Sequence, residues 1–340
     1  MTNGTKQNWT LFHARLHRTL RQWQLLPKGQ SVLVAVSGGQ DSLCLLKLLW
    51  DLQPKWKWQV AIAHCDHRWS SDTGIADHVR QIAQGWDLPF YLKTANQLRE
   101  TEAAAREWRY QALTEIAQAR GFSILVTAHT KSDRAETLLY NLIRGAGTEG
   151  LQALTWQRPL TSNIQLVRPL LNFSRAETYQ FCQQFQLPIW DDAANQNLNY
   201  ARSRIRAHVI PYLQTHFNPQ VETALAQTAE VLRAEVEYLE DTASQIFQQA
   251  TTVTVPEGLN RTVVRSAPLA LQRRVMRRFL QQILPSAPTF EQIEELTHLI
   301  NAPNRSRTSS LPTGATDKKQ RKLTSYAEVE GDWILVKNQE

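Results

Sequence analysis

A glycine-rich segment between two apolar runs has the residue types of a phosphate site. The apolar residues 32–36 predict a buried parallel strand, and the leucine-rich residues 43–49 predict a buried helix. Gly38 and Gly39 allow a tight turn, and the free N–H groups of the following helix would point at phosphate oxygens. No lysine of a Walker A loop follows. The residues expected to hold a nucleotide here are Ser37, Gly38, Gly39, Gln40, Asp41 and Ser42.

Asp41 is an acid inside this phosphate site. A carboxylate beside a phosphate is repelled unless a cation lies between them, so we interpret Asp41 as a Mg²⁺ ligand that bridges to pyrophosphate oxygens. A tight strand-to-helix turn, with serine and aspartate as caps, is the alternative interpretation. The order of the two serines and the acid favours the nucleotide site.

Histidines follow two further strands. His64 and His67 come after the apolar residues 59–63, and His129 follows residues 123–128. Ligands of an open parallel sheet bind at the carboxyl ends of its strands, so these side chains are expected to line the nucleotide pocket. Two histidines and one acid without a fourth ligand nearby are weak evidence for a zinc site.

Two acids and an arginine lie in predicted helices beside the same edge. Asp133 and Glu136 are three residues apart, which places both carboxylates on one helical face near the N-terminus. The helix dipole alone would explain acids there, and binding of an ammonium group is the functional alternative. Arg106, in the helical residues 102–120, has the planar guanidinium that suits a phosphate.

Basic residues are frequent in the second half of the chain. The formal net charge of +7 favours a polyanionic partner, although charge alone is a weak argument. Arginines on a helix with an apolar face are better candidates for phosphate contacts than those of the basic tail, which reads as a solvated loop. The residues expected to contact RNA are Arg202, Arg204, Arg206, Arg273, Arg274, Arg277 and Arg278.

The elements that must position these side chains alternate between strands and helices. This alternation predicts the α/β class with a doubly wound parallel sheet, whose carboxyl edge collects the three polar segments. Residues 166–170 are expected as an edge strand ended by Pro169, and residues 190–195 as a polar turn. A smaller, mainly helical substrate-binding domain follows.

Three domains are expected from the pattern along the 340 residues. They are 1–215 with the nucleotide site, 216–302 with a long linker helix at 219–250, and a basic tail at 303–340 with a short strand. The three cysteines are widely spaced and fit a reducing compartment. No apolar stretch is long enough to span a bilayer, so a cytoplasmic location without membrane contact is expected. Homodimer formation stays open.

Several segments together resemble the tRNA(Ile)-lysidine synthases, a subfamily of the PP-loop ATP pyrophosphatases. SGGQDS at 37–42 is typical of the whole superfamily. The subfamily is indicated by HCDHR at 64–68, EAAAREWRY at 102–110, residues 129–150, RPLL at 168–171 and DDAANQNLNYARSRIR at 191–206. The resemblance is close over 31–213 and looser to about residue 300.

The resemblance implies a two-step reaction that uses ATP and Mg²⁺. The family adenylates the carbonyl oxygen on carbon 2 of the wobble cytidine of an isoleucine tRNA with a CAU anticodon. The side-chain amine of free L-lysine then displaces AMP, so the tRNA reads AUA rather than AUG. By this resemblance Asp41 binds the metal, Arg106 acts at the α phosphate, and Asp133 and Glu136 hold the lysine.

Departures from the family pattern limit what the resemblance implies. Thr130 to Thr137 keep Asp133 and Glu136, but the family's first aspartate and its glutamine are replaced, and Arg68 is displaced. A tRNA thiolase, an amide-forming synthetase acting on a small acid and a non-catalytic RNA-binding protein are the rival interpretations. The scattered cysteines argue against the thiolase. The arginine-rich second half argues against the amide-forming synthetase, and the intact SGGQDS argues against the non-catalytic protein.

Overall fold

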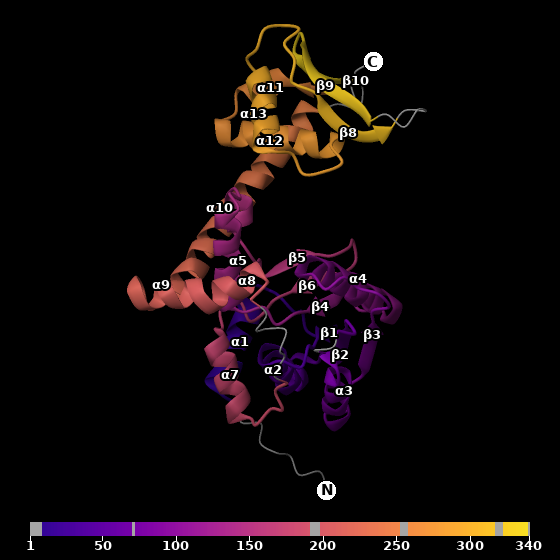
Figure 1. The fold of residues 1–340 in the computed structure, drawn as a ribbon, viewed down its shortest axis with the longest axis vertical. Helices are drawn as coiled ribbons and strands as arrows, with labels where there is room; N and C mark the ends of the chain where they lie inside the picture. Colours follow the sequence, from indigo (N-terminus) through magenta and orange to yellow (C-terminus); the bar gives the residue numbers. More distant parts are fainter. Residues whose placement is uncertain (1–8, 70–71, 191–197, 252–257, 317–321, 339–340) are drawn as a thin grey trace. The chain divides into compact units, whose positions relative to one another are not determined.

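The computed structural model describes residues 9–69, 72–190, 198–251, 258–316 and 322–338. The chain divides into two compact units, Met1–Arg233 and Ala234–Glu340, which are drawn in Figure 1. The division falls inside helix α10 (Val221–Ala250), so this helix contributes residues to both units. Most of the polar turn expected at 190–195 lies outside the described residues.

A mixed six-stranded sheet forms the centre of the first unit. Its strands are β1 (Ser31–Ala35), β2 (Gln59–Asp66), β3 (Phe90–Thr94), β4 (Ile124–Val126), β5 (Gln157–Pro159) and β6 (Gln165–Val167). Their order is β3-β2-β1-β4-β6-β5, and all neighbours except β5 and β6 are parallel. This arrangement confirms the doubly wound sheet.

The sequence predicted an edge strand at 166–170, but the corresponding strand β6 lies inside the sheet. It pairs with β4 on one side and with the antiparallel β5 on the other. Pro169 follows the last residue of β6, Val167, by two positions, so it interrupts no ladder hydrogen bond. The short β5 carries few apolar residues, and for that reason the sequence pattern did not reveal it.

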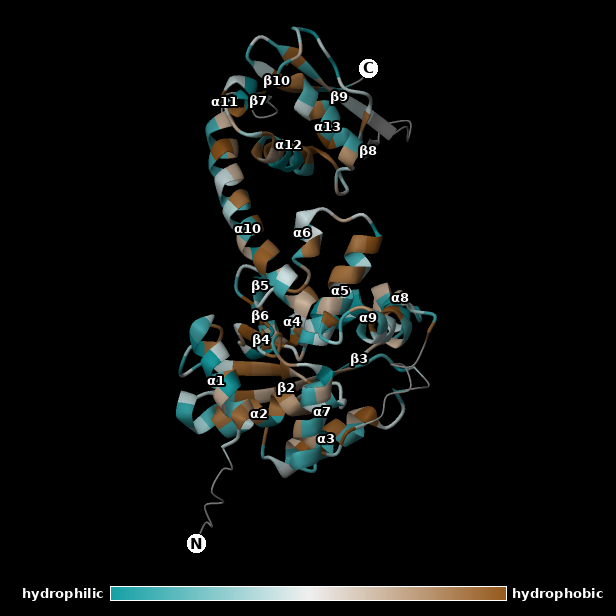
Figure 2. Cartoon of the chain, turned by 90° about the vertical axis from the view of Figure 1, so that its left-hand side faces the viewer, coloured by the Kyte–Doolittle hydropathy of each residue, from teal (hydrophilic) through white to brown (hydrophobic). Residues whose placement is uncertain are grey.

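Helices cover both faces of this sheet. They are α1 (Leu11–Gln22), α2 (Gln40–Trp56), α3 (Ile75–Gly85), α4 (Glu102–Arg120), α5 (Lys131–Ile143), α6 (Thr148–Leu151), α7 (Arg175–Gln184), α8 (Ala201–Arg204), a π-helical turn (Ile205–Val209) and α9 (Ile210–His216). Alternate residues of β1 point to opposite faces: Val32 and Val34 belong to one buried cluster and Leu33 to another. Figure 2 shows the hydrophobic strands surrounded by helices with hydrophilic outer surfaces.

The second unit contains helices and an antiparallel sheet. Besides part of α10 it contains β7 (Gly258–Asn260), α11 (Arg261–Arg265), α12 (Leu269–Ile283), α13 (Phe290–Leu299), β8 (Leu311–Thr316), β9 (Lys322–Glu330) and β10 (Trp333–Asn338). The strand order is β7-β10-β9-β8. The segment expected as a basic tail with one short strand therefore supplies three of the four strands, and β10 is the strand that was expected. Ala327, Val329 and Ile334 are fully buried in the core of this unit, which explains why the segment folds.

Among the described residues, no helix is both long and apolar enough to cross a membrane.

Candidate active site

A cavity of about 440 Å³ opens at the carboxyl edge of the parallel strands. Three segments that follow neighbouring strands line it, as the topology requires. Of the residues expected from the sequence, the lining includes Ser37, Gly39, Gln40, Asp41, Ser42, His64, His67, Arg106, His129, Asp133 and Arg206. Gly38 and Glu136 adjoin the cavity without lining it.

The turn between β1 and α2 has the geometry of an anion site. Gly38 has φ +90°, and a Cβ atom there would lie 3.3 Å from Ile75 and 3.4 Å from Trp190, so both conformation and space require glycine. Gly39 is the N-cap of α2 and leaves the first N–H groups of that helix without an intrahelical partner. The Ser42 hydroxyl donates to the Gly39 carbonyl at 2.8 Å and accepts from the Ser37 N–H at 3.2 Å, which fixes the turn.

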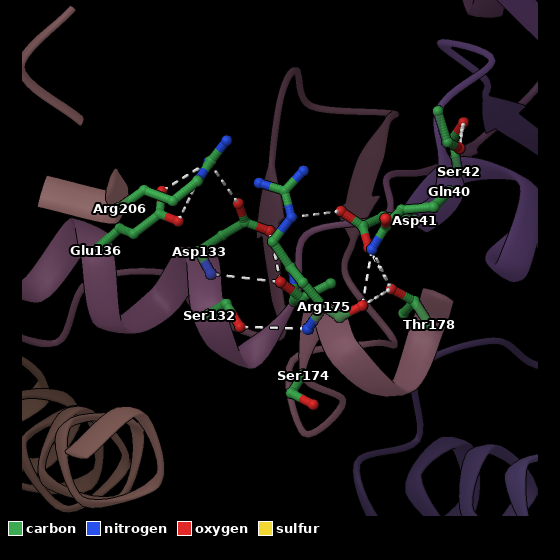
Figure 3. A network of polar contacts seen from close by, with 12 residues as sticks. Gln40, Asp41, Ser42, Ser132, Asp133, Glu136, Ser174, Arg175, Thr178 and Arg206 are labelled. Carbon is green, nitrogen blue, oxygen red and sulfur yellow. Dashed lines mark hydrogen bonds and ion pairs between the residues drawn. The ribbon is translucent and has the colours of Figure 1, made fainter. Parts of the chain in front are cut away.

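Asp41 lies in the first turn of α2 and contacts helix α7 (Figure 3). Its carboxylate accepts a hydrogen bond from the Thr178 hydroxyl and lies 3.4 Å from the Arg175 Nε atom. Burial raises the pKa of this carboxyl, and Asp133 adds to that shift, while Arg175 opposes it. Arg175 is therefore the cation that Asp41 contacts in the first unit.

The surroundings of Asp41 fit a Mg²⁺ ion that is also held by phosphate oxygens. Mg²⁺ usually takes one or two carboxylates and completes its shell with phosphate and water oxygens. Asp41 offers one hard oxygen ligand at the cavity wall, beside the N–H groups that would hold phosphates. No group of three or more metal-ligating side chains occurs among the described residues, so a site made by the protein alone is not indicated in that part of the chain.

The three histidines occupy different surroundings. His64 is buried, and its Nδ1 atom lies 2.7 Å from the Val36 carbonyl, while burial lowers its pKa. His67 lies 3.2 Å from an Asp72 carboxylate oxygen and packs against the Trp69 and Trp108 rings. Both side chains line the cavity wall.

His129 is deep in the cavity beside several arginines. Burial first, and the charge of Arg168 next, lower its pKa to about 3. Its Nδ1 atom lies 2.9 Å from the Thr127 hydroxyl. The imidazole is therefore neutral at physiological pH.

Asp133 and Glu136 lie on one face of α5, as predicted, but they differ in their contacts. One oxygen of Asp133 accepts hydrogen bonds from the Thr130 N–H at 2.7 Å and the Thr130 hydroxyl at 2.8 Å, which makes it part of a capping box. Burial would raise the pKa of Asp133, but His129, Arg175 and the two Thr130 bonds outweigh it, so the pKa is lowered. Glu136 is buried, which raises its pKa despite its ion pair with Arg206.

Three arginines interact with Tyr110, and a fourth, Arg109, precedes it in α4; Arg106, Arg109 and Tyr110 line the cavity. The guanidinium carbons of Arg106 and Arg158 each lie 5.2 Å from the ring centroid, and the buried Arg168 interacts with the Tyr110 hydroxyl. Arg109 lines the cavity next to them. No carboxylate of the described residues pairs with any of the four, so this wall is strongly positive.

The remaining predicted arginines are already engaged. Arg202 lies 3.6 Å from a Glu102 carboxylate oxygen, and Arg204 donates to two backbone carbonyls at 2.9 Å. In the second unit, Arg273 pairs with Glu294. The Glu240 carboxylate is shared by the three other arginines of α12, Arg274, Arg277 and Arg278. Their contact with RNA stays a prediction.

Comparisons with known proteins agree with this geometry. Residues 10–213 match a family model described as a PP-loop domain, and residues 259–323 match one described as a TilS substrate binding domain. A tRNA(Ile)-lysidine synthase of Nostoc sp. is 58% identical and covers 98% of both chains. This chain belongs to the tRNA(Ile)-lysidine synthase family.

Further members of the family match this chain at lower sequence identity. The tRNA(Ile)-lysidine synthase of Synechocystis sp. is 56% identical over 89% of this chain and 94% of its own length. The chloroplastic tRNA(Ile)-lysidine synthase of Zygnema circumcarinatum is 35% identical over 83% of this chain and 78% of its own. The resemblance that the motifs indicated is confirmed, and the PP-loop match supports ATP as the nucleotide.

A solved structure outside this family shares the fold. A U34-tRNA thiolase from Methanococcus maripaludis superposes with a TM-score of 0.56 at 15% identity, over 65% of this chain and 78% of its own. At that identity the likeness shows the fold alone. In the present chain Cys44 and Cys182 are buried. Burial also raises the pKa of the Cys65 thiol to about 12, so thiolate chemistry is disfavoured.

Sequence reasoning missed three arginine or threonine side chains of the site. Arg175 and Thr178 at the start of α7 hold Asp41, and Arg168 supports Tyr110. The capping box Ser174-x-x-Glu177 predicts where α7 begins. The capping box does not indicate that the start of α7 packs against the phosphate turn.

Proposed function

We propose that this protein ligates lysine to carbon 2 of the wobble cytidine of an isoleucine tRNA with a CAU anticodon. ATP is cleaved to AMP and pyrophosphate, and an adenylated tRNA is the intermediate. The product, lysidine, changes codon reading from AUG to AUA. One observation carries the proposal: in a member of this family, the phosphate turn and Asp133 of α5 line the same cavity, and Glu136 lies one turn further along that helix.

The phosphate turn and Arg106 would hold ATP for the first step. The N–H groups at the start of α2 point at the pyrophosphate, and Arg106 neutralises charge at the α phosphate. Asp41 would hold Mg²⁺, which stabilises the charge of the leaving pyrophosphate when it is bound. Gln40 donates to the Arg175 carbonyl at 2.7 Å and so keeps the turn against α7.

Asp133 and Glu136 would serve the second step. A pair of carboxylates suits the ammonium group of lysine, and the amine has to lose a proton before it can attack. His129 has a neutral imidazole at the same wall, so it adds no positive charge that would repel the ammonium. One of the two carboxylates would take the proton.

RNA would bind through arginines of both units. The target cytidine must leave the anticodon stack to reach the cavity, and backbone contacts have to compensate for the lost stacking. Arg204 is exposed on the first unit, Arg202 is half-buried and Arg206 lines the cavity, while Arg273, Arg274, Arg277 and Arg278 are on α12. Thiolation is less supported, because that reading relied on reactive or cluster-binding cysteines. The cytoplasmic location follows from the same substrate.

The identity of the nucleotide product tests this proposal. We expect the protein with ATP, Mg²⁺ and a CAU-anticodon isoleucine tRNA transcript to release AMP and pyrophosphate. A transcript whose wobble base is uridine serves as the matched control, because uridine cannot give the adenylated cytidine. Release of ADP and phosphate, or equal cleavage with the control transcript, would contradict the proposal.

A further inference from the structure

Glu136, one of the two acids assigned to lysine, is already paired with an arginine. Arg206 binds Glu136 through two parallel contacts, Nε to Oε1 at 2.6 Å and Nη2 to Oε2 at 2.7 Å (Figure 3). The same Nη2 atom lies 3.7 Å from Oδ1 of Asp133, whose other oxygen is held by Thr130. An incoming ammonium group therefore finds both oxygens of Glu136 occupied.

Arg206 also lies between the cavity and Glu136. The Glu136 side chain is 3% exposed and does not line the cavity, whereas that of Arg206 is 32% exposed and does. Arg206 belongs to the π-helical turn Ile205–Val209, a rare conformation that is frequent at functional sites. Lysine can reach Glu136 only if the guanidinium moves aside.

We infer that Arg206 is a resident counter-ion of the lysine site, which the lysine ammonium displaces from Glu136. This inference rests on the proposed function and adds a gating residue to it. A buried carboxylate without a counter-ion is strongly destabilising. Lysine binding is therefore most favourable when its ammonium takes the place of the Arg206 guanidinium, because Glu136 then stays paired throughout. Arg206 keeps Glu136 paired while lysine is absent.

The exchange links lysine binding to the presence of an anion in the cavity. Once displaced, the Arg206 guanidinium faces the cavity and needs a negative partner of its own. The phosphates of a bound nucleotide supply one, and a guanidinium binds phosphate through paired hydrogen bonds. Lysine is therefore expected to bind tightly after the nucleotide and weakly before it. This order favours adenylation ahead of lysine entry.

Lysine titration calorimetry on the full chain without RNA tests the exchange. We expect Arg206→Ala to bind lysine about tenfold more tightly than the unchanged protein, because lysine no longer competes with a tethered cation. Guanidinium chloride at a few millimolar should weaken lysine binding to Arg206→Ala by replacing the lost group, and should have little effect on the unchanged protein. Equal or weaker lysine binding by Arg206→Ala would overturn the inference.

A nucleotide analogue provides an independent measurement. A non-hydrolysable ATP analogue with Mg²⁺ should strengthen lysine binding to the unchanged protein several-fold, and should leave Arg206→Ala almost unaffected. An equal effect on both proteins would argue against the exchange. Arg206→Lys retains a cation with single-point contact, so its lysine affinity should fall between the two. If Arg206→Ala does not fold by circular dichroism, the same comparison is made with Arg206→Lys.

Two further variants separate this inference from the proposed function. Arg80→Ala removes an arginine paired with Asp77 away from the cavity, and should leave lysine binding unchanged. Glu136→Gln should abolish tight lysine binding, also in combination with Arg206→Ala. If Glu136→Gln binds lysine like the unchanged protein, the lysine site itself is misplaced. If Glu136→Gln loses lysine but Arg206→Ala gains none, only the exchange is wrong.

Discussion

At the scale of single residues, burial decides the charge state of the site more than the residue types do. Asp41, His64 and Glu136 each have a pKa shifted toward the neutral form, with burial as the largest cause. The pKa of Asp133 is lowered instead, because the charges of His129 and Arg175 and the hydrogen bonds from Thr130 outweigh the effect of burial. The pKa of Asp41 is therefore raised and that of Asp133 is lowered, although both are aspartates of the same cavity.

Asp41→Asn separates catalysis from stability. We expect pyrophosphate release to fall about 100-fold or more, because the amide is a poor Mg²⁺ ligand and the leaving group loses its stabilisation. The free energy of unfolding should not decrease, since burial already disfavours the Asp41 charge. Pyrophosphate release and urea unfolding measure the two effects. Asp77→Asn on the exposed side of α3 is the control; loss of stability in Asp41→Asn would contradict this account.

His129 predicts a dependence of stability on pH. Its pKa of about 3 in the folded chain lies below the ordinary value of 6.5, so the unfolded chain binds the proton first. The stabilisation is complete above pH 6.5 and is lost as the pH falls toward 3, by up to about 1.4 kcal/mol per pH unit. His129→Asn should flatten this slope in urea unfolding between pH 6.5 and 4.5. An identical slope in both proteins would show that His129 is not the group responsible.

At the scale of elements, helix α5 is held between the cavity and helix α10. Its Lys131 and Ser132 contact Thr223 and Glu222, and its buried Arg134 lies 2.8 Å from an oxygen of Glu230. The acids of the site thus sit on a helix whose opposite side is anchored.

Glu230→Gln tests this anchor. The Glu230 carboxylate also accepts from Trp156 at 3.1 Å and Arg233 at 2.9 Å. Its loss leaves the buried Arg134 without a counter-charge, so the free energy of unfolding of the first unit should fall by about 2–3 kcal/mol. Urea unfolding followed by tryptophan fluorescence measures it. Glu235→Gln, at an exposed position of the same helix, should change it by less than about 0.5 kcal/mol; equal effects would refute the anchor.

The elements also show what could be predicted from the sequence. The strands before Ser37, His64 and His129 are continuous apolar runs, so their ends and the shared edge were predictable. Strand β9 mixes Ser, Thr and Glu with its buried residues, so its apolar alternation is weak, although its partners β8 and β10 are its neighbours in the sequence. Only the short strand at the end of this segment was therefore predicted. Arg175 lies 134 residues after Asp41 and Arg206 lies 70 residues after Glu136, and such contacts depend on packing that periodicity does not encode.

At the scale of the whole molecule, the chain with its net charge of +7 is divided into two compact units. The first unit contains the cavity and its phosphate turn. The second contains four arginines on α12, each tied to a glutamate, which limits their side-chain freedom before any phosphate arrives. Preorganised arginines of this kind suit repeated contact with an RNA backbone.

The salt dependence of tRNA binding tests the α12 arginines. Arg278→Gln leaves Glu240 with Arg274 and Arg277, so the unit should keep its fold. The slope of log K against log salt should become shallower by about 0.7–0.9 if one phosphate contact is lost. Filter binding of the tRNA transcript over a salt series measures it. Arg80→Gln carries the same charge change, and an equal loss of slope there would indicate net charge rather than a contact.

The transfer of lysine to the wobble cytidine is the central claim, and one assay tests it most directly. Radiolabelled lysine is incubated with the protein, ATP, Mg²⁺ and the CAU-anticodon isoleucine tRNA transcript, and the label in RNA is measured together with AMP. We predict one lysine incorporated for each AMP released, and none when the wobble cytidine is replaced by uridine. AMP release without label in the RNA, or label that persists in the uridine transcript, would contradict the account.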